Sequence, residues 1–533
     1  MARSIRILVF ALLLAPAAMT SALANTYYIA ANGSDSNDGA SKTTPWMHAP
    51  GMTNCTGNCG STTPAPGDTF IFRGGDTWHE HAASGSPVGL PWIWSWSGAA
   101  GKLIYVGVDK TWFAGSSFAR PILNEDNPLS TSTVSSCRYD DQNVNTAMFD
   151  GASYITFDGF EFTGKCWSGA QDPNTSSFTF NGTHVVVENL YFHGWTVQSG
   201  FTYDDHASIA GGIRKGDTSN ICQYNVFDGS DSTYGTTGSY PSGKATGFAI
   251  RNACGVVAFS VFNRVSNGLI SSTTSVHDCL FHDLYEPQGS QHGNIWNSNN
   301  DNLINLGPQS FYNNVTYNIN EGVGTWLMPS GNVAYIFNNV SWNQSNSSNC
   351  FLLGGGTPAT TAYIYNNTFD SPCNVRALNN GFDPVWNGTI FFQNNHYIGY
   401  SPASISSTYS CDSGARCTFT DNGNEVFQSE SVANGQGYDK ADFYAPTSAN
   451  DATLGVAAND TNLCRTFSAD LALCSGTSRG VTEQPGSGGL VATSPAISPV
   501  ARPASGAWAA GAYELPGGPA PLKPPTNLTA IVE

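Results

Sequence analysis

A short phrase that recurs through the middle of the chain constrains the fold more than any other feature of the sequence. In each copy, apolar or aromatic residues flank a small residue or an asparagine. The copies lie at 157–162, 187–192, 224–227, 259–262, 276–281, 311–315, 336–340, 364–368 and 391–396. The later copies carry an Asn-Asn pair and follow one another at steps of 25 to 28 residues. Such a period is typical of one coil of a solenoid.

A second phrase opens with glycine and adds another short β-like run to each period, as at Gly211, Gly247, Gly268 and Gly293. Gly, Asn, Ser and Thr separate the runs, and no helical spacing lies between them, which favours parallel strands stacked about 4.8 Å apart. A β-propeller is disfavoured because its blades need about 40 residues or more. In a solenoid the Asn-Asn pairs would stack as a hydrogen-bonded amide ladder, and the alternative is that they only mark turns.

Three further segments resemble the right-handed parallel β-helix proteins of the pectate lyase superfamily. They are the opening 27–39, the phrase Pro66-Gly-Asp-Thr-Phe-Ile-Phe-Arg-Gly-Gly75, and the closing Ser494-Pro-Ala-Ile497 with Gly511-Ala-Tyr-Glu514. The resemblance implies an all-β, right-handed parallel β-helix with an N-terminal opening segment and an irregular C-terminal cap. A fold of this kind hosts many activities, so the resemblance is specific for the fold.

The expected organisation follows from the repeats and from shifts in composition. We expect a signal peptide at 1–24, an opening segment and first coils at 25–125, the β-helix core at 126–400, and the last coils and C-terminal cap at 401–515. Residues 516–533 are a Pro-rich linker or the start of a further module, and the chain reads as a fragment of something longer. A cap is expected because a bare terminal coil would expose unpaired strand edges.

The N-terminus has the pattern of a secretory signal. Arg3 and Arg6 precede an apolar run at 7–14, and Ala22-Leu-Ala24 supplies small residues before a cut at Asn25. No later segment approaches the roughly 20 apolar residues that a membrane span needs. The sequence therefore predicts a secreted protein, extracellular or periplasmic, that does not insert in a membrane.

Charge excludes one class of partner. The chain has 21 Lys and Arg against 39 Asp and Glu, a net charge of −18, and a surface so acidic repels phosphate backbones and anionic lipid. Nucleic acid is therefore not an expected partner.

Cysteine usage fits an oxidising compartment. Sequence-local pairs among the 13 cysteines predict disulfides at Cys55/Cys59, Cys350/Cys373, Cys411/Cys417 and Cys464/Cys474. Cys222, Cys254 and Cys279 lie in apolar stretches and are predicted to be small core residues. The odd count leaves at least one free thiol.

Polar residues beside the glycine-led phrase are the candidate site, because side chains of successive coils stack into an outward strip that can hold a linear polymer. The strip comprises Asp204, Asp205, His206, Arg214, Lys215, Arg251, Ser271, His292, Asn294 and Trp296. Three basic residues on neighbouring coils are notable in so acidic a chain, and the alternative is solvated surface charge.

The lyases of the resembled family remove the proton α to a uronate carboxyl. The resemblance implies Lys215 or Arg214 as the base, Arg251 as the carboxylate clamp, and Asp204, Asp205 and Asp217 as ligands of Ca²⁺. His292 is a further catalytic candidate, and His206, Asn294 and Trp296 are substrate-binding candidates. Trp326 and Trp342 are further candidates for stacking on sugars, with core packing as the alternative.

The sequence departs from the better-known members of this family. It lacks the Trp-Ile-Asp-His phrase of one pectate lyase class, and Gln291-His292-Gly293 is only a fragment of the polygalacturonase motifs. A glycoside hydrolase would need paired carboxylates, for which Asp283 and Glu286 beside His292 are candidates. We therefore expect a monomeric protein that acts on extracellular polysaccharide, as a lyase of an acidic glycan. The alternatives are a non-catalytic glycan-binding or structural protein, and a hydrolase.

Overall fold

The structure is a computed structural model. It describes residues 24–81, 88–139, 145–168, 176–199, 207–211, 219–232, 248–265, 267–270, 273–285, 294–297, 308–320, 323–327, 333–344, 349–354, 360–370, 373–377, 386–400, 409–446, 451–465, 472–477, 482–486, 489–493 and 500–515.

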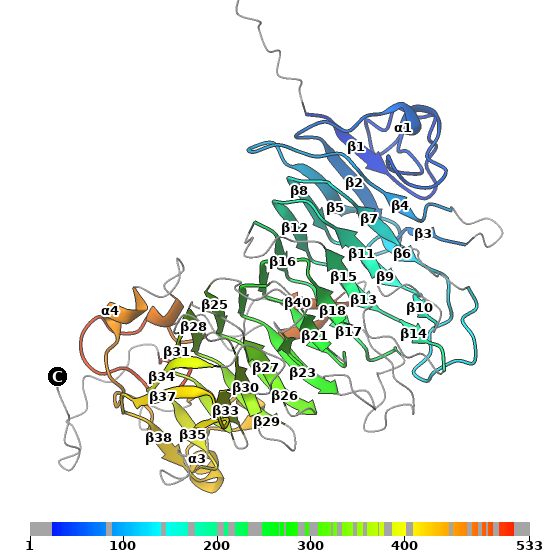
Figure 1. Ribbon diagram of the computed structural model, residues 1–533. Helices are drawn as coiled ribbons and strands as arrows, with labels where there is room; N and C mark the ends of the chain where they lie inside the picture. Colours follow the sequence, from blue (N-terminus) through cyan, green and yellow to red (C-terminus); the bar gives the residue numbers. More distant parts are fainter. Residues whose placement is uncertain are drawn as a thin grey trace, which may run out of the picture.

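Three long parallel sheets, here called A, B and C, run the length of the molecule (Figure 1). In the described residues sheet A has 13 strands: β1 (Thr26–Ile29), β2 (Thr69–Gly74), β5 (Ile104–Phe113), β8 (Ile155–Asp158), β12 (Val185–Glu188), β16 (Ile221–Gln223), β19 (Val256–Ala258), β22 (Ser275–His277), β25 (Gln309–Tyr312), β28 (Val333–Phe337), β31 (Thr360–Tyr365), β34 (Asn387–Gln393) and β37 (Arg416–Asp421). Sheet C has 12 in the same part of the chain: β3 (Thr77–His79), β6 (Ile122–Asn124), β9 (Glu161–Thr163), β13 (Tyr191–His193), β17 (Val226–Asp228), β20 (Val261–Asn263), β23 (Leu280–Tyr285), β26 (Val315–Asn320), β29 (Val340–Gln344), β32 (Thr368–Asp370), β35 (His396–Ile398) and β38 (Val426–Gln428).

Sheet B has 11 strands within the described ranges: β4 (Trp92–Ile93), β7 (Ala147–Phe149), β11 (Ser176–Phe180), β15 (Ala207–Gly211), β18 (Phe248–Arg251), β21 (Asn267–Ile270), β24 (Trp296–Asn297), β27 (Val323–Leu327), β30 (Asn349–Leu353), β33 (Asn374–Ala377) and β36 (Tyr409–Cys411). Each coil runs from sheet A to sheet C to sheet B and then back to sheet A one step further along. The predicted right-handed parallel β-helix is confirmed.

The core is a column of inward-facing side chains that repeats from coil to coil. On sheet C, Phe162, Phe192, Phe227, Phe262 and Phe281 stack with ring centroids 4.4 to 5.1 Å apart. All five are buried. Parallel pairing in register forces equivalent residues above one another, so the repeat of the sequence becomes an aromatic stack.

A two-residue corner joins sheet A to sheet C, and the Asn-Asn pairs form it. The first asparagine takes a left-handed backbone conformation, with φ of 56° at Asn338 and 53° at Asn366, which asparagine tolerates better than most residues. The second asparagine points inward: the backbone N–H of Asn314 donates to Oδ1 of Asn339, and that of Asn339 donates to Oδ1 of Asn367, each at 3.0 Å. The predicted amide ladder is confirmed.

The last coil is followed by an irregular segment that contains α3 (Glu430–Gly435), η2 (Lys440–Asp442), α4 (Thr461–Cys464) and η3 (Ala472–Cys474). This segment runs back over the outer faces of sheets A and C, where Tyr444 and Trp508 are buried. The first asparagines of the corners dock it: Nδ2 of Asn366 donates to the Ala509 carbonyl, and Nδ2 of Asn394 donates to the Ala458 carbonyl, each at 3.1 Å.

Remaining elements are short: α1 (Gly57–Ser61), the paired strands β10 (Cys166–Trp167) and β14 (Thr196–Val197), and the antiparallel hairpin of β39 (Thr482–Gly486) and β40 (Gly489–Thr493). Within the described part of the chain, no helix has the length and apolar character that crossing a membrane requires.

Six disulfides join described cysteines, which fits an oxidising compartment. The four predicted pairs are confirmed. Cys222 and Cys254 are buried in the core, as predicted. They also bond to one another, which the sequence did not predict: Cys222 lies in β16, and Cys254 lies in the turn before β19, the next strand of sheet A. A sixth bond joins Cys137 to Cys166, and Cys279 is a buried free thiol.

Candidate functional site

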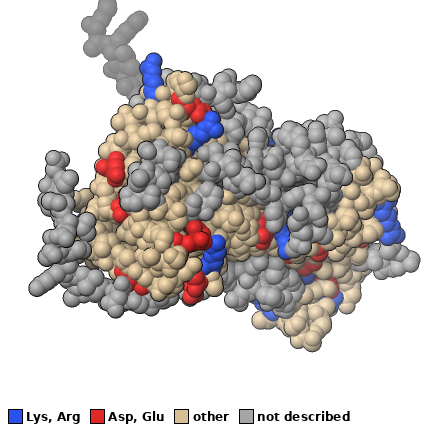
Figure 2. All heavy atoms as spheres, turned by 90° about the horizontal axis from the view of Figure 1, so that it is seen from below, with Lys and Arg blue, Asp and Glu red and all other residues tan. Residues whose placement is uncertain are grey.

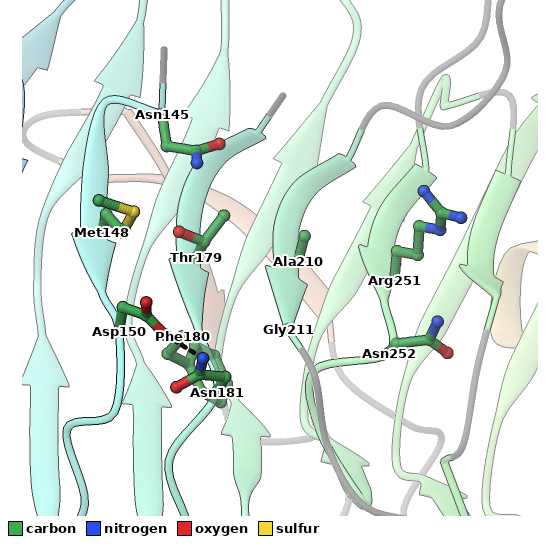
Figure 3. Close-up of a pocket in the computed structure, with 10 residues that line it drawn as sticks. All are labelled: Asn145, Met148, Asp150, Thr179, Phe180, Asn181, Ala210, Gly211, Arg251 and Asn252. Atoms are coloured by element: carbon green, nitrogen blue, oxygen red, sulfur yellow. Dashed lines mark hydrogen bonds between the residues drawn. The ribbon is translucent and has the colours of Figure 1, made fainter. Parts of the chain in front are cut away.

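A cavity of about 360 Å³ lies on the outer face of sheet B (Figure 3). It spans four neighbouring strands, β7, β11, β15 and β18. Its lining residues are Asn145, Met148, Asp150, Thr179, Phe180, Asn181, Ala210, Gly211, Arg251 and Asn252.

The floor of the cavity is one row of outward-facing side chains. Thr179 pairs in register with Met148 on one side and with Ala210 on the other, and Ala210 pairs with Arg251. Side chains alternate along a strand, so the residues that directly precede these four point into the core and are buried: Ala147, Phe178, Ile209 and Ile250. The register therefore brings residues from four distant parts of the sequence onto one wall.

A second row of polar residues stands where the strands of sheet B end. Asp150 follows β7, Asn181 follows β11 and Asn252 follows β18, and in Figure 3 the three lie below the first row. Nδ2 of Asn181 donates to Oδ1 of Asp150, and Oδ1 of Asn181 accepts from the backbone N–H of Gly151. The corner of one coil is thus fixed to that of the next by a side-chain amide.

The structure places Arg251, one of the sequence-predicted residues, at one end of this cavity. Its side chain is half-buried on the last of the four strands. Asp150, an exposed carboxylate, stands at the other end. The cavity thus presents a cation and an anion at opposite ends of an uncharged floor.

Seven of the predicted site residues lie outside the described residues: Asp204, Asp205, His206, Arg214, Lys215, Asp217 and His292. In sequence, the first three directly precede β15, and the next three follow Gly211, which lines the cavity. Ser271 and Glu286 also lie outside the described residues.

Asn294 and Trp296 are corrections to the predicted site. Both are buried, with none of their surface exposed, and Trp296 packs in the central core. The register continues from Arg251 through Ile270 to Asn297, so Asn297 occupies the outward row and its neighbour Trp296 points inward. A side chain enclosed in the core cannot stack on a sugar.

Trp342 is also buried and not available at the surface. Its ring faces outward from sheet C but lies beneath Phe443 and Tyr444 of the C-terminal segment, at centroid distances of 5.8 and 5.7 Å. Core-like packing, the alternative use of this tryptophan, is what the structure shows. The side chain of Trp326 lies outside the described part of the structure.

The described residues do not form a calcium site by themselves. These contain no group of three or more His, Cys, Asp and Glu side chains arranged to hold a metal ion. Around the cavity they supply one carboxylate, Asp150. A Ca²⁺ site at this sheet would therefore need carboxylates from outside the described residues, where the predicted ligands Asp204, Asp205 and Asp217 lie.

Asp283, proposed as half of a hydrolytic pair, is engaged elsewhere. It lies in β23 of sheet C, where its carboxylate is 2.8 Å from Nδ1 of His282 and accepts from Nδ2 of Asn318 at 2.9 Å. Burial opposes the charge of Asp283, but these hydrogen bonds outweigh it and lower its pKa. A carboxyl held ionised on sheet C does not serve as an acid in the sheet B cavity.

A separate charged cluster lies on the outer face of sheet C. His193 Nδ1 is 2.7 Å from Asp231 and its Nε2 is 3.0 Å from Glu161. Burial disfavours the imidazolium, but the two carboxylates overcome this and raise the pKa of His193 to about 9. Charged side chains are otherwise sparse, and Figure 2 shows them scattered among uncharged residues on one face of the molecule.

Sequence reasoning missed most of the cavity. Met148, Asp150, Thr179 and Asn181 precede the first glycine-led phrase, so the repeat that led to Arg251 did not point to them. One signal could have found Thr179, because it alternates with the apolar Phe178 and Phe180. Asp150 and Asn181 sit in corners, where alternation gives no information.

No family model matches the chain, and none of the curated proteins matches it. Among solved structures, it is similar to a rhamnogalacturonan lyase at 13% identity, covering 83% of this chain and 98% of that one, with a TM-score of 0.41. It is also similar to pectate lyase Pel9A at 15% identity, 83% and 93% coverage and a TM-score of 0.35.

A third solved structure is the GH136 lacto-N-biosidase from Eubacterium ramulus, at 10% identity, 76% and 68% coverage and a TM-score of 0.37. All three TM-scores are below 0.5, so the fold assignment rests on the three parallel sheets themselves. These sheets and the cavity define the chain as a right-handed parallel β-helix protein with a hollow on one face, the class that the resemblance predicted.

Proposed function

We propose that this protein is secreted and acts on an extracellular acidic polysaccharide by β-elimination at the outer face of sheet B. The observation that carries the proposal is the place of Arg251, in a cavity that crosses four coils. A cavity of this length along the axis of a solenoid suits a linear polymer, and a guanidinium is a good partner for a carboxylate.

In the proposed reaction Arg251 neutralises the uronate carboxyl, which makes the proton on the neighbouring carbon more acidic. Lys215, or Arg214 in its place, removes that proton, the bond from the ring to the glycosidic oxygen at the β carbon breaks, and a double bond forms between the two carbons. The leaving oxygen takes a proton. Asp204, Asp205 and Asp217 would hold Ca²⁺, which supplies further positive charge to the carboxylate.

A non-catalytic glycan-binding role is the second candidate, and the composition of the cavity favours it. Among the described lining residues, the titratable ones are Asp150 and Arg251, and the remainder are amides, a hydroxyl and apolar groups. Such a wall binds sugars through hydrogen bonds without providing an obvious base. The hydrolase alternative has no comparable support, because Asp283 lies on sheet C.

Release of unsaturated uronate separates the two candidates. The purified protein is incubated with a panel of acidic and neutral polysaccharides, with and without Ca²⁺, and the ultraviolet absorbance of the new double bond is followed. Product that disappears in both Lys215→Ala and Arg251→Gln, while the far-ultraviolet circular dichroism is unchanged, supports the lyase. Binding to a glycan without product from any substrate supports the binding protein, and neither binding nor product contradicts both.

A further inference from the structure

The cavity on sheet B carries its two charges at opposite ends. Met148, Thr179, Ala210 and Arg251 are consecutive register partners, and Asp150 stands two residues beyond Met148 on the first strand's corner. Three strand spacings of about 4.8 Å separate the first strand from the last, so the two ends lie about 14 Å apart. That length accommodates several sugar units of an extended chain.

Between the ends, the described lining is uncharged. The floor offers a thioether, a hydroxyl and a methyl group at Met148, Thr179 and Ala210, and the corner row offers the amides of Asn181 and Asn252. Further along the same outward row, Arg376 forms an ion pair with Asp412, with Nε 2.6 Å from Oδ1. In the described part of the row, cationic side chains are therefore several coils apart.

Asp150 is held in a fixed place. Its Oδ1 accepts a hydrogen bond from Nδ2 of Asn181, whose own Oδ1 accepts from the backbone N–H of Gly151. The interaction ties the carboxylate to the next coil and leaves it facing the cavity as an acceptor (Figure 3). A neutral sugar can donate hydroxyl groups to such an acceptor, whereas a uronate brings a second negative charge against it.

We infer that this site takes a glycan in which an isolated uronate is flanked by uncharged sugars, and that Asp150 discriminates against uniformly charged polyuronates. The inference rests on the proposed function, since it assigns the uronate to Arg251. In a homopolymer of uronates every sugar carries a carboxylate, so a chain anchored at Arg251 places another one beside Asp150. Repulsion by a fixed like charge is an effective way to reject a competing ligand.

Calorimetric titration with three oligosaccharides of equal length tests the inference: an oligogalacturonate, an oligosaccharide with one uronate among neutral sugars, and a fully neutral one. The single-uronate probe should bind the protein at least about tenfold more tightly than the oligogalacturonate. Asp150→Asn should reduce the ratio of these two affinities, because the oligogalacturonate alone should bind this variant more tightly than it binds the unmodified protein. Raising the salt concentration should also narrow the ratio for the unmodified protein, because salt screens the repulsion.

Two arginine variants serve as matched controls. Arg251→Gln should weaken both charged probes about tenfold or more and leave the neutral probe unchanged, whereas Arg376→Gln, in the same outward row outside the cavity, should leave all three unchanged. Thermal unfolding confirms that each variant is folded.

The possible failures are distinguishable. Equal or tighter binding of the oligogalacturonate by the unmodified protein, or an Asp150→Asn ratio that does not move, overturns the inference and leaves the proposed function standing. Failure of all three probes to bind, or tightest binding of the neutral probe, contradicts the proposed function and the inference together.

Discussion

Asn339 and Asn367 lie one coil apart, and two N–H groups of Asn339 donate to the same side-chain oxygen of Asn367. Both the backbone N–H and the Nδ2 of Asn339 donate to Oδ1 of Asn367, each at 3.0 Å, while Nδ2 of Asn367 reaches back to the carbonyl of Ile336, also at 3.0 Å. Neither side chain is exposed. The side-chain oxygen and amide of each of these two second-position asparagines bond to the coils on either side, so the ladder stabilises the stacking of coils that the other features depend on.

Removing one step of this ladder should be costly. Asn367→Ala leaves the backbone N–H of Asn339 without its acceptor and the Ile336 carbonyl without the Asn367 amide, at about 1–3 kcal/mol for each buried group that water cannot reach. Nδ2 of Asn339 also loses one of its two acceptors. We expect a loss of about 3 kcal/mol or more in the free energy of unfolding, measured by guanidinium denaturation. The exposed Asn434→Ala is the control, and an equal loss in both variants would contradict the role of the ladder.

The C-terminal segment should be more firmly docked at acidic than at neutral pH. Burial raises the pKa of Asp460 to about 6, although Arg502 and a hydrogen bond from Asn394 oppose the shift. Because the pKa is higher in the folded state, the contribution is fully present below the ordinary Asp value of 3.8 and is lost as the pH rises through about 6.

Asp460→Asn should therefore remove a fall in stability between pH 4 and pH 7 on the order of 2 kcal/mol. Because the new amide still accepts from Asn394, the variant should exceed the unmodified protein in melting temperature at pH 7 and approach it at pH 4. Parallel melting curves of the two proteins across that pH range would refute this origin of the pH dependence.

His193 should make the stability of the protein depend on pH in the alkaline range. Burial opposes its charge, but Asp231 and Glu161 raise its pKa to about 9, so its stabilising effect is full below 6.5 and is lost as the pH rises through 9. Asp231 is 39% exposed, so solvent screening reduces the effect to about 1–2 kcal/mol. Compared with His193→Gln, the unmodified protein should lose that advantage between pH 7 and pH 10 in thermal melts. An advantage that persists at pH 10 would contradict the ion-pair explanation.

The Cys222–Cys254 disulfide, which the sequence did not predict, should contribute more to the free energy of unfolding than the short-range Cys55–Cys59 disulfide. Cys222 and Cys254 are 32 residues apart, and the chain-entropy model gives such a loop about 4 kcal/mol. Cys55 and Cys59, only 4 apart, should contribute about 2 kcal/mol in the same model. The paired alanine replacements of each bond, compared by denaturant unfolding under oxidising conditions, check this order, and the reverse order would show that loop length is not the deciding factor.

Repetition made the fold predictable. The phrase around Asn314, Asn339 and Asn367 specifies each coil locally, and coils of similar length can bury their apolar faces only by stacking, so the sequence predicted both the helix and its ladder. It did not predict that the preceding asparagines, such as Asn366 and Asn394, would dock the C-terminal segment. That contact joins residues more than a hundred positions apart in the case of Asn366 and Ala509, and no local pattern reports it.

The candidate site was only partly predictable, because it depends on the register of the strands. Arg251 was found from its place beside a repeated glycine, yet Trp296 was assigned outward when its neighbour Asn297 is the outward residue. The period of a strand is two, so a displacement of one residue exchanges the core and the surface. Cys222 and Cys254 are core residues, as predicted, but their disulfide was not predicted, since apolar neighbours indicate burial and not which cysteine lies opposite.

What the sequence by itself determined is the coil: its length, its two-residue asparagine corner and its apolar inward face, all of which local spacing encodes. Only the tertiary structure decided which residues share an outer wall, and so brought Asp150 and Arg251 into one cavity. The physical reason is that the conformation of one coil depends on residues close together in the sequence. Which side chains lie side by side on an outer face depends instead on the hydrogen-bond register between coils, and no single coil specifies that register.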